Sequence, residues 1–158
     1  MRLLPEINEA LQEQCLVELT NVIKYKIISS YFEDLRLSKL AKKFKDQADE
    51  EYAHYTKVID YINDRLGGKY IPVEVITPTI MLNSYLEAAK LYLETEISTT
   101  ESLEALANLI EDEKSYIDRP FIDEMLHIQI EEERNADDFF KQVSLVHDIV
   151  LFDKLMEG

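Results

Sequence analysis

The four residues Glu51-Tyr52-Ala53-His54 place a carboxylate and an imidazole three positions apart. An α-helix turns once in about 3.6 residues, so on a helix these two side chains lie side by side on one face. They can hold one metal ion together, and Glu-x-x-His is a ligand pattern of helical bundles that bind two metals. The spacing alone is weak evidence, because most chance matches lie on a solvated helix surface. Here, however, Glu51 and His54 interrupt an apolar seam.

Apolar residues that recur at helical spacing predict the elements that must position this pair. Four long helices are expected, from Pro5 to about Asp34, from Ser38 to Gly67-Gly68, from Thr77-Pro78 to Ile110, and from Pro120 to about Val143. Ser38 and Thr77 are the expected N-caps of the second and third helices. A last apolar stretch, Ile149 to Met156, predicts a short fifth helix.

The stretch between the second and third helices, residues 69–77, is too long for a tight turn and contains the β-branched run Val73 to Ile76. It predicts an extended crossover along the length of the bundle, with a short strand as the alternative. Only 3 Gly and 4 Pro in 158 residues favour a few long helices over many short strands. We therefore predict an all-α, four-helix bundle with a long crossover and a short C-terminal helix, as one domain over residues 1–158.

All four predicted seams are interrupted near their middle by polar side chains. These residues are Glu18, Glu51 with His54, Glu96, and Gln129 with Glu132. Four carboxylates converging in a core would repel each other and lose hydration, and two divalent cations would neutralise them. Oxygen-rich ligands with one imidazole suit iron or manganese. The alternatives are that a small error in helix phase turns a glutamate outward, that residues 131–133 form a solvated face, and that His54 is a core histidine.

The composition limits the classes of partner. The chain has 17 basic and 32 acidic residues, a net charge of -15, which argues against binding to nucleic acid or to an anionic membrane surface. The single cysteine, Cys15, excludes an intramolecular disulfide and a thiolate-rich metal site. No apolar run approaches the length needed to span a membrane, and Met1 to Pro5 is too short for a signal peptide. A cytoplasmic location is the expectation.

Over nearly its whole length the chain resembles the ferritin family, most closely the non-haem bacterial branch. The resemblance is carried by Val17-Glu18-Leu19 with Tyr25, by Asp49 to His54, by Glu96, and by Gln129 to Glu133, at intervals that match the family almost without gaps. It implies a ferroxidase that oxidises Fe(II) with dioxygen or peroxide. It also implies storage of Fe(III) inside a hollow homo-oligomeric shell of about 24 subunits.

The resemblance also implies roles for individual residues. Glu18, Glu51 and His54 would hold the first iron, with Glu51 bridging to the second. Glu96 and Glu132 would complete the second site. Gln129 would contact bound oxygen or water beside the pair of irons, and Tyr25 would be a one-electron donor.

The chain departs from the family in several places. Glu50 and Glu131 match a third iron site, but Ile128 replaces its remaining carboxylate. Tyr52 stands where bacterioferritins carry their haem-binding methionine, which predicts no haem. A second Glu-x-x-His is replaced by Gln129 and Glu132.

The acidic entry pore of the family would fall at Arg119 and Ile122, with Asp118 and Asp123 as nearby substitutes. His127 and His147 receive no role. Two other classes are weighed against a storage ferritin: a di-iron redox enzyme without a cage, of the rubrerythrin or oxidase kind, and a non-catalytic four-helix scaffold. The absence of a Cys-x-x-Cys motif counts against a rubrerythrin, and the cost of four uncompensated carboxylates counts against a scaffold.

Overall fold

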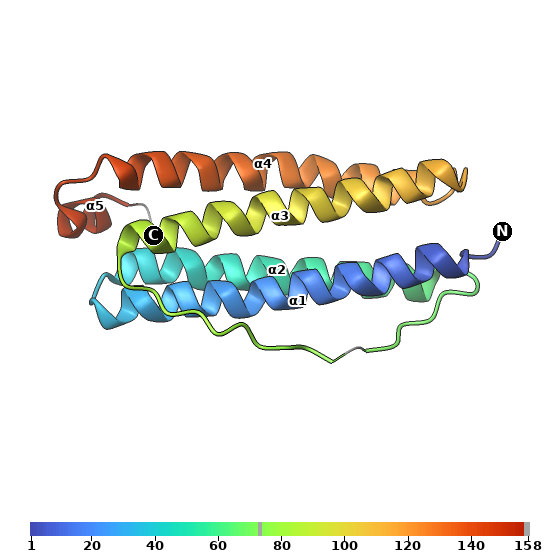
Figure 1. The fold of residues 1–158 in the computed structure, drawn as a ribbon, viewed down its shortest axis with the longest axis horizontal. Coiled ribbons are helices and arrows are strands. Elements are labelled where there is room, and N and C mark those ends of the chain that lie inside the picture. Colours follow the sequence, from blue (N-terminus) through green and yellow to red (C-terminus); the bar gives the residue numbers. More distant parts are fainter. Residues whose placement is uncertain (73, 157–158) are drawn as a thin grey trace.

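The computed structural model describes residues 1–72 and 74–156, which contain five α-helices and no strand. The helices are α1 (Pro5–Asp34), α2 (Ser38–Asp64), α3 (Tyr85–Asp112), α4 (Arg119–Ser144) and α5 (Ile149–Leu155). Helices α1 and α2 form one antiparallel hairpin, α3 and α4 form a second, and α1 packs against α3 (Figure 1). The predicted all-α, four-helix bundle with a short fifth helix is confirmed.

The ends of α1 and α2 lie close to the predicted positions, although neither helix has a side-chain N-cap. Helix α1 begins at Pro5, as predicted. Ser38 was predicted as the N-cap of the second helix, but it is the first helical residue, and the cap position is Leu37. Helix α2 ends at Asp64, before Gly67, whose φ of 84° is a left-handed conformation that glycine adopts without strain.

The predicted start of the third helix near Thr77 is wrong, since α3 begins at Tyr85. The N-cap is Ser84, whose hydroxyl accepts a hydrogen bond from the Glu87 backbone nitrogen at 3.1 Å. In return the Glu87 carboxylate accepts from the Asn83 backbone nitrogen at 2.7 Å. This reciprocal cap defines the helix start more strongly than a threonine followed by proline. Leu82, which falls within the predicted third helix, lies in the crossover and packs on the core from there.

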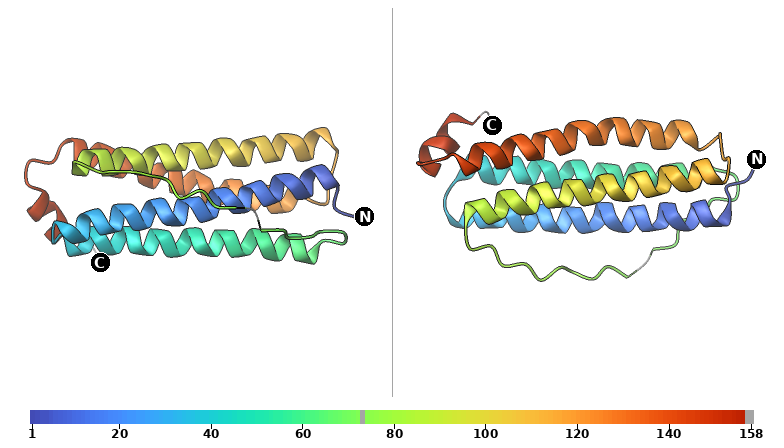
Figure 2. Two further views of the ribbon diagram at one scale, coloured as in Figure 1. Left: turned by 60° about the horizontal axis from the view of Figure 1, so that its bottom comes forward. Right: turned by 45° about the horizontal axis from the view of Figure 1, so that its top comes forward.

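The predicted long crossover is confirmed: the chain between α2 and α3 runs beside the bundle from one end to the other (Figures 1 and 2). Two side chains of α1 hold its first part. Asn8 exchanges two hydrogen bonds with the backbone of Lys69, at 3.1 and 3.3 Å, and Gln12 accepts one from the Ile71 nitrogen at 3.0 Å. Of the β-branched run expected here, Val73 lies outside the described residues.

The core consists of two apolar clusters with polar side chains between them. One cluster is aromatic and contains Tyr25, Phe32, Phe44, Tyr92 and Phe139. The other is aliphatic, with Ile7, Leu11, Val58, Ile62 and Leu103 among its members. Both clusters draw on all four long helices, so they hold the helices in register on either side of the middle of the bundle.

The short helix α5 closes one end of the bundle. Asp153 of α5 accepts a hydrogen bond from the Leu40 backbone nitrogen at 2.8 Å, in the first turn of α2. Lys39 donates to the carbonyl oxygens of Lys154 and Met156, both at 2.9 Å. Both contacts are favourable for the helix dipoles, because an acidic side chain lies at the N-terminal end of α2 and a basic side chain lies at the C-terminal end of α5. None of the helices among the described residues combines the length and the apolar character that a membrane-spanning helix needs.

Asp118 cannot serve as an exposed substitute in an entry pore, because it is fully buried. Its carboxylate accepts hydrogen bonds from Arg65 Nε at 2.6 Å, from the Tyr61 hydroxyl and from the Ser115 hydroxyl. That prediction is therefore wrong, since Asp118 ties the α3–α4 turn to the end of α2. Asp123 is exposed and lies 3.9 Å from Arg119, and its role in iron entry stays a prediction.

Candidate metal centre

The five predicted ligands come from all four long helices and meet between the two apolar clusters. Glu18 lies on α1, Glu51 and His54 on α2, Glu96 on α3, and Glu132 on α4. The four glutamates are buried, with exposed fractions from 0% to 8%, and the imidazole of His54 is 15% exposed. An amphipathic helix buries one stripe of side chains, so glutamates on that stripe are carried into the interior.

The ligand atoms form two groups that share one residue. Glu18, Glu51 and His54 make up the first group, and Glu51, Glu96 and Glu132 make up the second. Within each group the candidate atoms lie within 4.8 Å of one another. Among the described residues, no other cluster of histidine, cysteine or carboxylate ligands has this geometry. The arrangement offers two adjacent metal positions with the Glu51 carboxylate between them.

Unpaired buried oxygens show that the first group fits a cation. Glu18 Oε2 and Glu51 Oε2 are buried and have no hydrogen-bond partner among the described residues. His54 Nδ1 lies 3.9 Å from the first oxygen and 3.7 Å from the second, beyond hydrogen-bonding distance. Buried carboxylate oxygens without a partner are costly, and a cation bound among these three atoms would compensate them.

Glutamine amides hold the other carboxylate oxygens. Gln14 Nε2 donates to Glu18 Oε1 at 3.0 Å. Gln47 Nε2 donates to Glu51 Oε1 at 3.3 Å and to Glu132 Oε2 at 2.9 Å. We did not predict these contacts, although the sequence carries a signal for them: in both α1 and α2 a glutamine precedes the glutamate by four residues, one helical turn.

The fourth carboxylate, Glu96, is held by the two residues that were predicted to be catalytic. The Tyr25 hydroxyl donates to Glu96 Oε1. Gln129 Nε2 donates to Glu96 Oε2 at 2.8 Å and to the Glu96 carbonyl oxygen at 3.1 Å. Both residues therefore contact a candidate ligand directly. The amide nitrogen of Gln129 donates both of its hydrogen bonds to Glu96, so this nitrogen is not free to contact bound oxygen.

The protein does not balance the charges of the cluster. Burial and the nearby Glu51 carboxylate raise the pKa of Glu18 well above its ordinary value and that of Glu96 to about 8. Burial also raises the pKa of Glu132 to about 7. Burial alone would raise the pKa of Glu51 and lower that of His54, but the two groups stabilise each other's charge, so the shifts are reversed. Without a metal the cluster retains protons, which a bound cation would displace.

The residues predicted for a third iron site lie outside these two groups. Glu50 and Glu131 are exposed, and Ile128 is half-buried. Glu50 is close enough for its charge to raise the pKa of Glu132. Tyr52, at the position relevant to haem, is 56% exposed. The absence of haem stays a prediction, as does the third site.

Known proteins are similar to this chain in sequence and in fold. The family model of the ferritin-like domain matches residues 8–146. A bacterial non-heme ferritin of Staphylococcus epidermidis is 32% identical over 129 residues, covering 81% of this chain and 76% of the relative. Ferritin BfrB of Mycolicibacterium smegmatis is 32% identical over 127 residues, covering 77% and 67%.

Two solved structures show the same likeness. The open pore ferritin from the archaeon Archaeoglobus fulgidus superposes with a TM-score of 0.92 at 25% identity, covering 98% of each chain. The Chlorobium tepidum ferritin has a TM-score of 0.85 at 26% identity, covering 96% of this chain and 95% of that one. With its central carboxylates and histidine on four helices, the chain belongs to the ferritin family.

Proposed function

We propose that this chain is an iron-storage ferritin whose centre oxidises Fe(II), the substrate, with dioxygen or peroxide. The observation that carries the proposal is the pair of ligand groups that share Glu51. Adjacent ions bridged by one carboxylate can each give one electron to the same oxidant. Two Fe(II) then become two Fe(III), while dioxygen takes up two protons and becomes hydrogen peroxide. With peroxide as oxidant, the same two electrons and two protons yield two water molecules.

The roles of the ligands follow from their types. His54 with Glu18 and Glu51 would bind one ion through nitrogen and oxygen, whereas Glu51, Glu96 and Glu132 would bind the other through carboxylates alone. Carboxylates are hard ligands that suit Fe(II) and Fe(III), and binding without an imidazole favours release of the product from the second position. The glutamine contacts fix the carboxylates before metal arrives, which limits the reorganisation needed on binding.

Replacing His54 with alanine should slow Fe(II) oxidation by at least about 10-fold, the smallest loss expected when an outer contact to a metal ligand is removed, without eliminating it, because Glu18 and Glu51 remain at the first position. Stopped-flow absorbance of Fe(III) formation measures the rate. His127→Ala is the matched control, since His127 is exposed on α4 and should leave the rate unchanged. A His54→Ala rate equal to that of the native protein would contradict its role as a ligand.

Tyr25→Phe tests the proposed electron donor. The phenol can lose an electron to the oxidant and its proton to Glu96 Oε1, which already accepts its hydrogen bond. We expect oxidation under excess oxidant to give a tyrosyl radical signal in electron paramagnetic resonance that is absent in Tyr25→Phe. Tyr92→Phe, in the same aromatic cluster, is the control and should keep the signal. A signal that persists without Tyr25 would assign the radical elsewhere.

Storage requires a shell, and we propose an assembly of about 24 copies, as in a closed symmetric oligomer. Aerobic loading with excess Fe(II), followed by gel filtration and an iron count, tests it. Many irons per chain on a very large particle would support a storage cage. About two per chain on a small particle would indicate the alternative, a di-iron redox enzyme. If the protein bound no iron, the non-catalytic four-helix scaffold would be the remaining alternative.

A further inference from the structure

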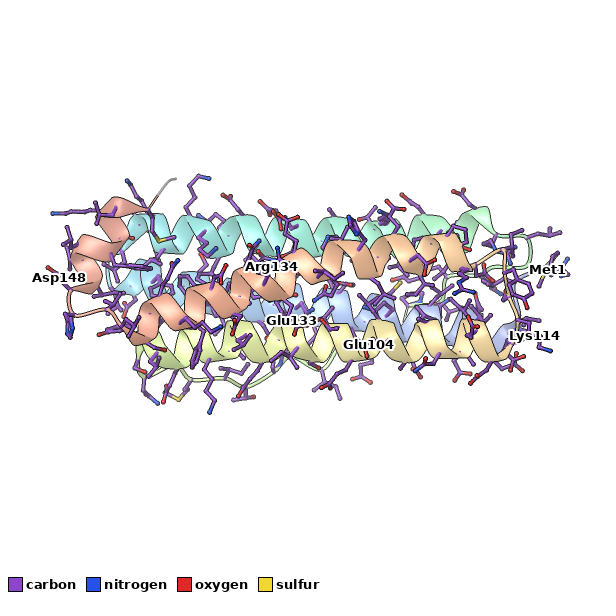
Figure 3. All side chains as sticks on the ribbon, turned by 90° about the horizontal axis from the view of Figure 1, so that it is seen from above. Met1, Glu104, Lys114, Glu133, Arg134 and Asp148 are labelled. Atoms are coloured by element: carbon purple, nitrogen blue, oxygen red, sulfur yellow. The ribbon has the colours of Figure 1, made fainter. Side chains whose placement is uncertain are left out.

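A groove of about 650 Å³ opens on the face where α3 and α4 lie side by side. Figure 3 looks onto this face, with Glu104 of α3 and Glu133 and Arg134 of α4 labelled. These charged side chains belong to the lining of the groove. Its apolar lining is formed by Leu93, Ile97, Leu126 and Ile130. Ile97 and Ile130 are 38% and 60% exposed, so the two helices leave an apolar surface open there.

The groove reaches the candidate metal centre through one side chain. Gln129 lines the groove and is only 4% exposed. Its amide nitrogen donates to Glu96 Oε2 at 2.8 Å, on the side of the second ligand group. Thr100, also in the lining, donates to the Glu96 carbonyl oxygen at 3.0 Å and to Glu133 Oε2 at 2.5 Å. The Gln129 side chain therefore contacts both the groove and the Glu96 carboxylate, so a movement of this side chain would alter the contact between them.

The lining of the groove has an apolar part and a charged part. Leu93, Ile97, Leu126 and Ile130 offer no ligands to a hydrated divalent cation, whereas Glu104, Glu133 and Asp137 add carboxylates to the lining. A small neutral molecule such as dioxygen loses little on entering apolar surroundings. The inner end also differs from the surface around Glu50 of α2, whose exposed carboxylate lies close enough to Glu132 to act on its charge and offers a cation a first ligand.

We propose that the α3–α4 groove is the route by which dioxygen reaches the metal centre, with the Gln129 side chain as its inner gate. Iron and oxidant then approach from different faces of the bundle. This inference rests on the proposed function, because the groove would supply the oxidant of that reaction. The inference adds a route for one substrate and assigns Ile97, Ile130 and Gln129 to that route.

Filling the groove tests the route. Ile97→Trp and Ile130→Trp place a large ring in the apolar lining, and both positions are exposed enough to accept it without disturbing the core. The dependence of the initial oxidation rate on dioxygen concentration is measured at fixed Fe(II) in the assembled protein. We expect the apparent KM for dioxygen to rise about fivefold in both variants. Anaerobic titration with Co(II), read by its visible absorption, should give the native stoichiometry.

The matched control is Leu86→Trp, an exposed leucine on α3 that does not line the groove. It should keep the native dioxygen dependence. Xenon supplies a reading that needs no turnover, because it occupies apolar cavities. Crystals of the native protein under xenon pressure should show xenon in the groove, and those of Ile130→Trp should not.

The possible outcomes separate the route from the function. Native oxidation with an unchanged dioxygen dependence in both groove variants would overturn the route alone. Loss of Co(II) binding with an unchanged dioxygen dependence would make the groove a metal route and overturn the proposal. Elution of the variants as smaller particles would identify the groove as a contact between copies, which also overturns it. A native protein that does not oxidise Fe(II) at all removes the proposed function, and the route falls with it.

Discussion

Glu51→Gln should abolish rapid Fe(II) oxidation, with a loss larger than the roughly 100-fold that removal of an outer contact to a metal ligand can cause. Glu51 is the one residue common to both ligand groups, so its loss removes the bridge and weakens both positions. The amide has nearly the same shape as the carboxylate but carries no charge. The side chain is 1% exposed, so the replacement fills the same space and no water-filled cavity replaces it.

Two measurements identify the cause of this loss. Anaerobic Co(II) titration should show fewer than the native number of bound ions, and circular dichroism should show unchanged helix content. Glu101→Gln is the matched control, because it makes the same change at an exposed position on α3. Glu51→Gln protein that oxidises Fe(II) at the native rate would exclude the bridged centre as the site of oxidation, whatever the assembly state of the protein.

The ligand positions could be predicted because helical periodicity determines them. Once the four helices are in register, the central residue of each seam has to lie in the core, so Glu18, Glu51, Glu96 and Glu132 converge. An error in a helix end, even the misplaced start of α3, does not move the middle of a helix to another face. The roles of these glutamates as ligands remain part of the proposal. The buried carboxylate oxygens of Glu18 and Glu51 that lack a hydrogen-bond partner support those roles.

Contacts between distant segments could not be predicted in this way. Asp118 looks like a loop carboxylate from its neighbours, but its partner Arg65 lies 53 residues earlier in the chain. The start of α3 was misjudged for a different reason. Both Pro78 and Ser84 are plausible first-turn signals, and only the hydrogen bonds of Glu87 decide between them.

Metal binding and fold stability place opposite demands on the middle of this bundle. The carboxylates of the centre repel each other, as the raised pKa values of Glu18 and Glu96 show. The apolar clusters on either side supply the burial that holds the helices together despite this repulsion. Gln14 and Gln47 then compensate part of the cost through hydrogen bonds and leave free the oxygens that face His54.

Stability at the far end of the bundle depends on a different carboxylate. Asp118→Ala should lower the free energy of unfolding by about 3–5 kcal/mol, because it leaves the guanidinium of Arg65 without its buried partner. Tyr61 and Ser115 lose their acceptor as well. For a chain of this length, the apparent melting temperature should fall by about 10 °C. Asp123→Ala is the control, since this exposed residue lies 3.9 Å from Arg119, and its shift should stay within about 2 °C.

The effect of Asp118→Ala should also depend on pH. Burial alone would raise the pKa of Asp118, but hydrogen bonds from Arg65, Ser115 and Tyr61 hold it below its ordinary value. The stabilisation by a carboxylate with a lowered pKa is complete above the pKa of the unfolded chain, about 3.9. It is lost as the pH falls through the lower pKa of the folded state. Thermal unfolding at pH 7 should therefore separate native and variant protein widely, and unfolding at a pH below that folded-state pKa should bring them together. An equal separation at both pH values would mean that lost packing, rather than the lost ion pair, causes the destabilisation.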